Sequence, residues 1–260
     1  MDLGLKGKVA AITGGSEGIG KATAMVLAAE GTKVAICARR KDVLETAAEE
    51  IRRESHGEVL TVSCDVIQPG QVERFVQQAL DAWGGIDILV NNVGTSFATS
   101  FETVSDEGWH ADLDLKLFSA IRASRVAIPS MRRRGGGRII NVLNIGGKAP
   151  GAESVPTSVS RAAGMALTKA LSKELAKDNI LVNAICIGLI KSGQTSRGAA
   201  RRYPNLSLDA AFKEMGARNP LGRIGEAEEA ANVIAFLASE RGSFVTGSAI
   251  NVDGGASAVV

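Results

Sequence analysis

Short apolar runs alternate with longer amphipathic runs along the whole sequence. Seven apolar runs, rich in β-branched residues, predict strands at 8–13, 33–38, 58–64, 86–92, 138–143, 180–186 and 248–253. Six runs with helical periodicity lie at 18–30, 41–54, 69–82, about 106–134, 155–177 and 226–239. Strands made of continuous apolar residues are typical of a parallel sheet that is covered on both faces. The alternation therefore predicts one α/β domain over residues 1–260, built on a doubly wound parallel sheet of about seven strands.

The stretch 188–225 differs from the rest of the sequence. It is rich in Gly, Ser and Arg, shows no clear periodicity, and follows the end of a predicted strand. In doubly wound sheets the ligand lies at the carboxyl ends of the strands. We therefore expect 188–225 to be a lid over a substrate, and we call it the lid segment.

The charge balance narrows the classes of partner. The 260 residues include 30 basic and 28 acidic side chains, which gives a net charge of +2 and no general attraction to nucleic acid or to a membrane. Cys37, Cys64 and Cys186 lie in or beside apolar runs, which favours buried, reduced thiols, and no metal-ligand spacing occurs. No charged-then-apolar leader precedes the first strand, so we expect a soluble cytoplasmic protein.

A glycine-rich turn follows the first strand. In "TGGSEGIG" the glycines Gly14, Gly18 and Gly20 have the spacing GxxxGxG, and a helix is predicted to begin within the motif. Glycine permits the tight turn and lets the backbone approach a pyrophosphate, which the helix N-terminus then attracts. The motif predicts a dinucleotide site, although a glycine turn without a ligand remains the alternative.

The sequence resembles the short-chain dehydrogenase/reductase family at six landmarks in order: "TGGSEGIG" (13–20), "CDV" (64–66), "NNVG" (91–94), "GRIINV" (137–142), "ILVNAICIG" (180–188) and "VTGSAINVDGG" (245–255). The resemblance implies a single-domain Rossmann-type fold and a nicotinamide cofactor. It places Asp65 at the adenine, and Ser192 where a Thr often bonds the carboxamide. The cofactor contacts that it implies are Gly14, Ser16, Gly18, Ile19, Gly20, Asp65, Val66, Asn92, Gly94, Arg161 and Ser192.

The end of the second strand selects the form of the cofactor. NAD enzymes of this family usually carry an acid there, whereas this sequence has Ala38 followed by Arg39 and Arg40. An acid would repel a 2′-phosphate, while Arg binds it with charge-assisted hydrogen bonds, so we expect NADP(H). Glu17 departs from the pattern, because some NADP members have a basic residue at that place. The alternative is that the arginines are only an exposed cationic start of a helix.

The catalytic positions depart from the family pattern most clearly. The family's chemistry moves a hydride between the nicotinamide and a carbonyl or alcohol carbon, with a Tyr as acid, a Lys beside it, a Ser on the substrate oxygen and an Asn in the proton relay. By resemblance these positions are Thr157, Arg161, Asn144 and Lys116 here. A Thr hydroxyl is a far weaker acid than a phenol, and Arg does not give up its proton. The usual mechanism therefore lacks its acid.

Two classes of function remain open from the sequence. The first is an oxidoreductase with rebuilt chemistry that uses Lys116 as a proton donor, and the second is a catalytically silent NADP(H)-binding sensor or partner subunit. Lys116 and Arg161 together predict a pocket for a small acidic or carbonyl substrate, whereas the alternative is that Lys116 extends to solvent or pairs with Asp112 or Asp114. The one tyrosine, Tyr203, falls in the lid segment, where a surface role is favoured.

Other titratable residues carry less information. His56 and His110 lie near predicted helix ends, which favours structural or exposed roles.

The resemblance also implies a homotetramer or a homodimer, built on the helices 106–134 and 155–177 and on the segment 245–255.

Overall fold

Seven strands form one parallel sheet in the order β3-β2-β1-β4-β6-β8-β9 in the computed structural model, which describes residues 1–260. The strands are β1 (Val9–Thr13), β2 (Lys33–Ala38), β3 (Val59–Ser63), β4 (Ile88–Asn91), β6 (Gly137–Asn144), β8 (Ile180–Ile187) and β9 (Ala249–Val252). Each strand predicted from the sequence is present, so the α/β, Rossmann-type fold is confirmed. The strand order reverses between β1 and β4, and such a switch point opens a crevice at the carboxyl ends of the strands.

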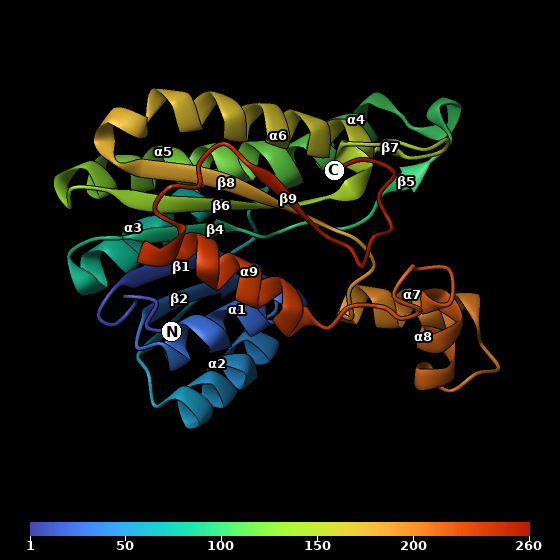
Figure 1. The fold of residues 1–260 in the computed structure, drawn as a ribbon, viewed down its shortest axis with the longest axis horizontal. Helices are drawn as coiled ribbons and strands as arrows, with labels where there is room; N and C mark the ends of the chain where they lie inside the picture. Colours follow the sequence, from blue (N-terminus) through green and yellow to red (C-terminus); the bar gives the residue numbers. More distant parts are fainter.

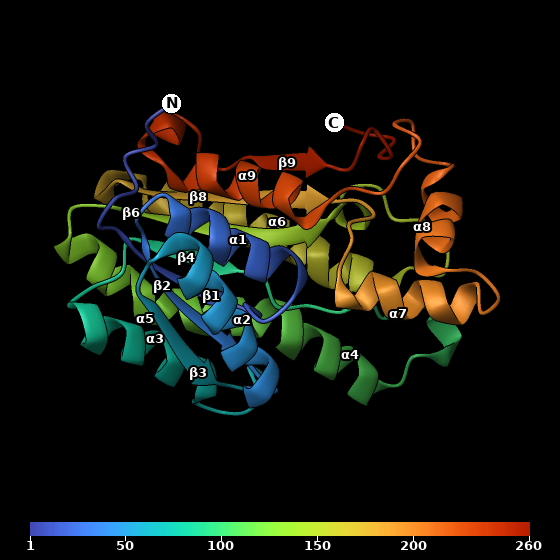
Figure 2. The ribbon, with the colours of Figure 1, turned by 90° about the horizontal axis from the view of Figure 1, so that it is seen from below.

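Helices cover both faces of this sheet. Figures 1 and 2 show α1 (Gly18–Ala29), α2 (Lys41–Ser55) and α9 (Ala227–Ala238) on one face. The other face carries α3 (Gln71–Trp83), α5 (Ser119–Arg133) and α6 (Thr157–Glu174). None of the helices is long and apolar enough to cross a membrane.

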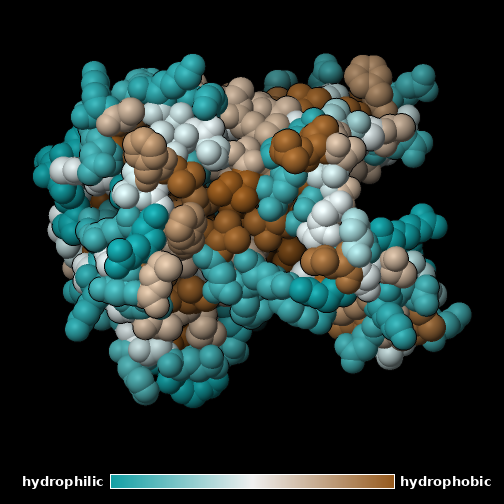
Figure 3. All heavy atoms as spheres, viewed as in Figure 1, coloured by the Kyte–Doolittle hydropathy of each residue, from teal (hydrophilic) through white to brown (hydrophobic).

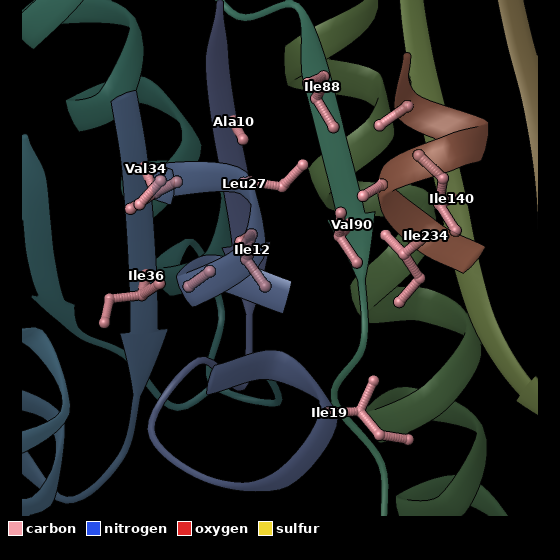
Figure 4. Packing of buried hydrophobic residues seen from close by; sticks show 14 of the residues in the cluster. Ala10, Ile12, Ile19, Leu27, Val34, Ile36, Ile88, Val90, Ile140 and Ile234 are labelled. Carbon is pink, nitrogen blue, oxygen red and sulfur yellow. The ribbon is translucent and has the colours of Figure 1, made fainter. Parts of the chain in front are cut away.

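Two apolar clusters fix the layers. One lies between the sheet and α1, α2 and α9, where Ile12 of β1, Ile36 of β2 and Val90 of β4 meet Leu27 and Ile234 (Figure 4). The second lies under α3 and α5 and includes the fully buried Phe75 and Met131. Since β1, β2 and β4 contribute to both clusters, their apolar runs are buried on both faces, as the sequence pattern predicted.

The predicted helix 106–134 is divided in the structure. It consists of α4 (Asp106–Leu113), a π-helical turn (Asp114–Phe118) and α5. A π-helical turn adds one residue to the helix and often lies at a functional site. Lys116 lies in this turn.

The lid segment contains two helices that the sequence did not predict, α7 (Gly193–Arg202) and α8 (Leu208–Gly216). They pack around a small cluster formed by Ala199, Phe212 and Ile224. Figure 3 shows a notch between this α7–α8 unit and the part of the molecule that carries the short antiparallel strands β5 (Ala98–Thr99) and β7 (Val155–Pro156). The α7–α8 unit of the lid segment is thus an ordered element that stands apart from the sheet.

Candidate functional site

A cavity of about 760 Å³ lies at the carboxyl ends of the strands, between the glycine-rich turn and the start of α7. Its volume is in the range of small-molecule and cofactor sites. Of the residues predicted to contact the cofactor, those that line it are Gly14, Ser16, Gly18, Ile19, Arg39, Arg40, Asp65, Val66, Asn92, Gly94, Arg161 and Ser192. The structure therefore brings together residues from six separate stretches of the sequence.

The glycine-rich turn has the conformation that a phosphate cradle requires. Gly14 has a φ of +70°, and α1 begins at Gly18 without any side-chain cap on its first N–H groups. The Asn92 side chain donates hydrogen bonds to the carbonyls of Thr13, at 2.9 Å, and Gly14, at 3.1 Å, which ties the end of β4 to the turn. Free N–H groups at a helix N-terminus attract phosphate, so these residues fit a dinucleotide.

Gly20 is the predicted contact that does not line the cavity. A Cβ at this position would lie 2.1 Å from the Gly14 carbonyl oxygen. Gly20 therefore allows the helix to pack against the turn, and its contact with the cofactor stays a prediction.

Arg39, Arg40 and Glu17 form the charged end of the cavity. The Arg40 guanidinium lies 2.9 Å from one Glu17 oxygen, and Arg197 of α7 lies 3.9 Å from the other. Arg39 is exposed, lines the cavity and has no ion-pair partner. Glu17, which departs from the family pattern, thus forms an ion pair with Arg40, and Arg39 is left without a carboxylate partner. Sequence reasoning missed Arg197, because it lies in the lid segment, where no helix was predicted.

The hydroxyl of Thr157 is fully used by the protein. It donates to the Phe97 carbonyl oxygen at 2.8 Å, and it accepts from the Phe97 amide at 2.9 Å and from the Lys116 ammonium at 2.7 Å. A hydroxyl has one proton to donate and two lone pairs to accept with. Thr157 is buried and does not line the cavity, so it holds the β5–β7 pair to the start of α6.

Lys116 is sealed behind the cavity. Its side chain is 0% exposed and its ammonium is bonded to Asp112, whose other oxygen accepts from Ser160 at 2.7 Å. Burial lowers the pKa of Lys116 to about 8, against the opposing effect of Asp112. The alternative from the sequence, pairing with Asp112, is confirmed. Of these two cations only Arg161 lines the cavity, and a substrate pocket that involves both stays a prediction.

Arg161 and Asn144 do line the cavity. One terminal nitrogen of Arg161 donates to the Val142 carbonyl at 2.9 Å, while its Nε has no partner. Burial lowers the pKa of Arg161 to about 10. The Oδ1 of Asn144 is also buried without a partner. These two side chains, rather than Thr157 and Lys116, are the ones available to a ligand.

The remaining candidates lie outside the cavity. Tyr203 ends α7, packs with the lid cluster and lies under the Arg202 guanidinium, which agrees with a surface role. His56 ends α2, and His110 lies in α4. The three cysteines are free and buried, as expected.

Comparison with known proteins adds family context to this geometry. The family model described as "Enoyl-(Acyl carrier protein) reductase" matches residues 14–257. The 3-oxoacyl-(acyl-carrier-protein) reductase of Thermotoga maritima is 34% identical over 251 residues, 96% of this chain and 98% of its own.

Two solved structures have the same fold over nearly the whole chain. The L-sorbose reductase of Gluconobacter frateurii, in complex with NADPH and L-sorbose, is 37% identical with a TM-score of 0.96 and covers 100% of both chains. An NADPH-bound short chain oxidoreductase of Pseudomonas aeruginosa PAO1, which contains an atypical catalytic center, is 36% identical with a TM-score of 0.88 and covers 97% of this chain and 98% of its own. This chain therefore belongs to the short-chain dehydrogenase/reductase family.

Proposed function

We propose that this protein binds NADP(H) in the cavity and does not carry out ordinary acid-assisted ketone reduction. The observation that carries the second part is the saturated Thr157 hydroxyl, which has no proton left for a substrate. Bound NADP(H) would supply a hydride, and the residues that would hold it are those of the glycine-rich turn, with Arg39 at the 2′-phosphate. Binding of NADPH by two structural relatives supports the choice of cofactor.

A second candidate is an oxidoreductase whose proton comes from Lys116. In its favour, burial brings the pKa of Lys116 to about 8, which suits a general acid near neutral pH. Against it, the hydrogen bonds from Lys116 lead through Thr157 to the Phe97 carbonyl and not into the cavity. A sensor or partner subunit that binds the cofactor without turnover is therefore the better fit. A cytoplasmic location stays a prediction.

The cofactor preference is tested by calorimetric titration with NADPH and NADH. One charged contact to the 2′-phosphate corresponds to about 10- to 100-fold in affinity, so NADPH should bind more tightly by that factor. Arg39→Met should remove most of the difference, while Lys41→Met, two residues on and outside the cavity, should leave it intact. Glu17→Gln should raise the affinity for NADPH by a few-fold, because Arg40 then loses its ion pair with residue 17 and is free to bind the 2′-phosphate. Equal affinities of the wild type for NADPH and NADH would refute the preference.

Turnover is tested by following NADPH oxidation with a panel of ketones, aldehydes and keto acids. General acid catalysis contributes about 10²–10⁴-fold, and we expect rates lower by at least that factor than the usual ~1–10³ per second. Rapid turnover that Lys116→Met abolishes would favour the second candidate instead.

A further inference from the structure

We propose that Arg161 and Asn144 form a binding site for a small hydroxy carboxylate on the floor of the cavity. The proposal rests on the proposed function, because the carboxylate would lie beside the bound dinucleotide. It names the class of ligand that the rebuilt positions of this chain would recognise.

The first argument is charge. The cluster beneath the cavity contains two cations, Lys116 and Arg161, but one carboxylate, that of Asp112. Both Asp112 oxygens are occupied, one by Lys116 and the other by Ser160, and Arg161 has no ion-pair partner. An unpaired buried charge is unfavourable unless a counter-charge joins it. The cavity floor therefore carries a positive charge that an anion would neutralise.

The second argument is the way in which Arg161 is held. The residue is 9% exposed, and one terminal nitrogen is fixed by the Val142 carbonyl. A Cβ on Gly94 would lie 2.1 Å from its other terminal nitrogen, and a Cβ on Gly147 would lie 3.0 Å from the Arg161 Cβ. Two glycines thus leave room for a guanidinium in one orientation. This pre-organised fork is the geometry that binds carboxylates with two parallel hydrogen bonds.

The third argument is Asn144, which shares the cavity with Arg161. Its Oδ1 is buried without a partner, and a buried acceptor without a partner is costly. Rotation of the Asn144 amide toward the cavity would let a hydroxyl group on the ligand satisfy that oxygen, while the carboxylate of the same ligand binds Arg161. A ribose hydroxyl from the dinucleotide could also bond to Arg161, but it is neutral and would leave the buried charge uncompensated.

The test compares L-lactate with L-lactamide, which has nearly the same shape but no charge. The protein is first titrated with NADPH alone, and this result judges the proposed function by itself. Each probe is then titrated into the NADPH-free protein and into the NADPH-saturated protein, and in the latter lactate cannot be oxidised because no NADP⁺ is present. We expect lactate to bind at least tenfold more tightly than lactamide, as a charge-assisted pair would give.

Variants locate the effect. Arg161→Met should abolish the preference for lactate over lactamide. Arg161→Lys keeps the charge but loses the two parallel donors of the guanidinium, so it should weaken the preference. This second variant also provides the test if Arg161→Met fails to fold. Tyr203→Phe, outside the cavity, should change nothing. The proposal is overturned if neither probe binds, if the two bind equally, or if lactate binds only to the NADPH-free protein, because the dinucleotide then uses Arg161 itself.

Discussion

At the scale of single residues, Lys116 and Asp112 form a buried ion pair whose hydrogen bonds connect the α4–α5 segment to α6. Lys116 lies in the π-helical turn, while its partners Thr157 and Ser160, the latter through Asp112, belong to α6. The family uses this region for a proton relay, and here each polar group is bound to another protein group. The network thus has the features of a structural connection between the α4–α5 segment and α6.

We predict that Lys116→Met lowers the free energy of unfolding by about 3–5 kcal/mol, because it leaves the Asp112 carboxylate buried without its partner. Urea unfolding at neutral pH measures the change. In the control, Lys116→Met is combined with Asp112→Asn, which removes both charges, and the loss should be clearly smaller than for the single variant. A single variant as stable as the wild type would show that the pair is not the structural connection we describe.

At the scale of elements, the start of α7 closes the cavity. Ser192 caps α7 by accepting from the Thr195 amide at 3.2 Å, and the Ser192 amide donates back to the Thr195 hydroxyl at 2.6 Å. A Cβ on Gly18 would lie 2.9 Å from the Ser192 Cβ, so the capped end of α7 sits directly against the glycine-rich turn. The order of α7 should therefore affect cofactor binding.

We predict that Ser192→Ala makes the start of α7 less ordered and weakens the binding of NADPH. Loss of an N-cap costs about 1 kcal/mol, so amide hydrogen exchange in α7 should become about fivefold faster, with a several-fold rise in the Kd for NADPH. Ser207→Ala is the matched control, since Ser207 caps α8 in the same way by accepting from the Ala210 amide at 3.3 Å but does not line the cavity. If both variants bind NADPH equally well, the capped end of α7 has no part in the site.

The elements also show what the sequence could and could not predict. The strands were predictable because short continuous apolar runs are typical of strands buried on both faces of a parallel sheet. The glycine-rich turn was predictable because its backbone conformation favours glycine. Helix α7 of the lid segment was missed because it buries only Ala199 and consists mostly of Gly, Ser and Arg, so few apolar residues mark its buried face. The pairing of Lys116 with Asp112, four residues earlier, could be proposed from the sequence, whereas the bond from Lys116 to Thr157 of α6 is a tertiary contact that no local pattern encodes.

At the scale of the whole molecule, large apolar side chains are exposed on the elements expected to form an oligomer. Phe118, the last residue of the π-helical turn before α5, is 44% exposed, Val159 of α6 is 45% exposed, and Phe244, just before β9, is fully exposed. All four residues of β9, the edge strand, are only half-buried. Figure 3 shows hydrophobic side chains gathered over the region of β8 and β9. Contiguous exposed apolar surface commonly marks an interface between chains.

We predict a dimer or a tetramer in solution, with a mass by light scattering of two or four times the 27.0 kDa chain. Val159→Glu places a charge on the outer side of α6, and burying that charge between two chains would be costly, so the assembly should become smaller. Leu208→Glu is the control, because Leu208 is 44% exposed in α8, which Figure 1 shows set apart from α5, α6 and β9. The assembly matters for the site, because Val159 lies two residues from both Thr157 and Arg161 and an interface there would hold the start of α6 in place. Val159→Glu should therefore also weaken the binding of NADPH. A monomeric wild-type protein would contradict both the expected oligomer and its expected effect on NADPH binding.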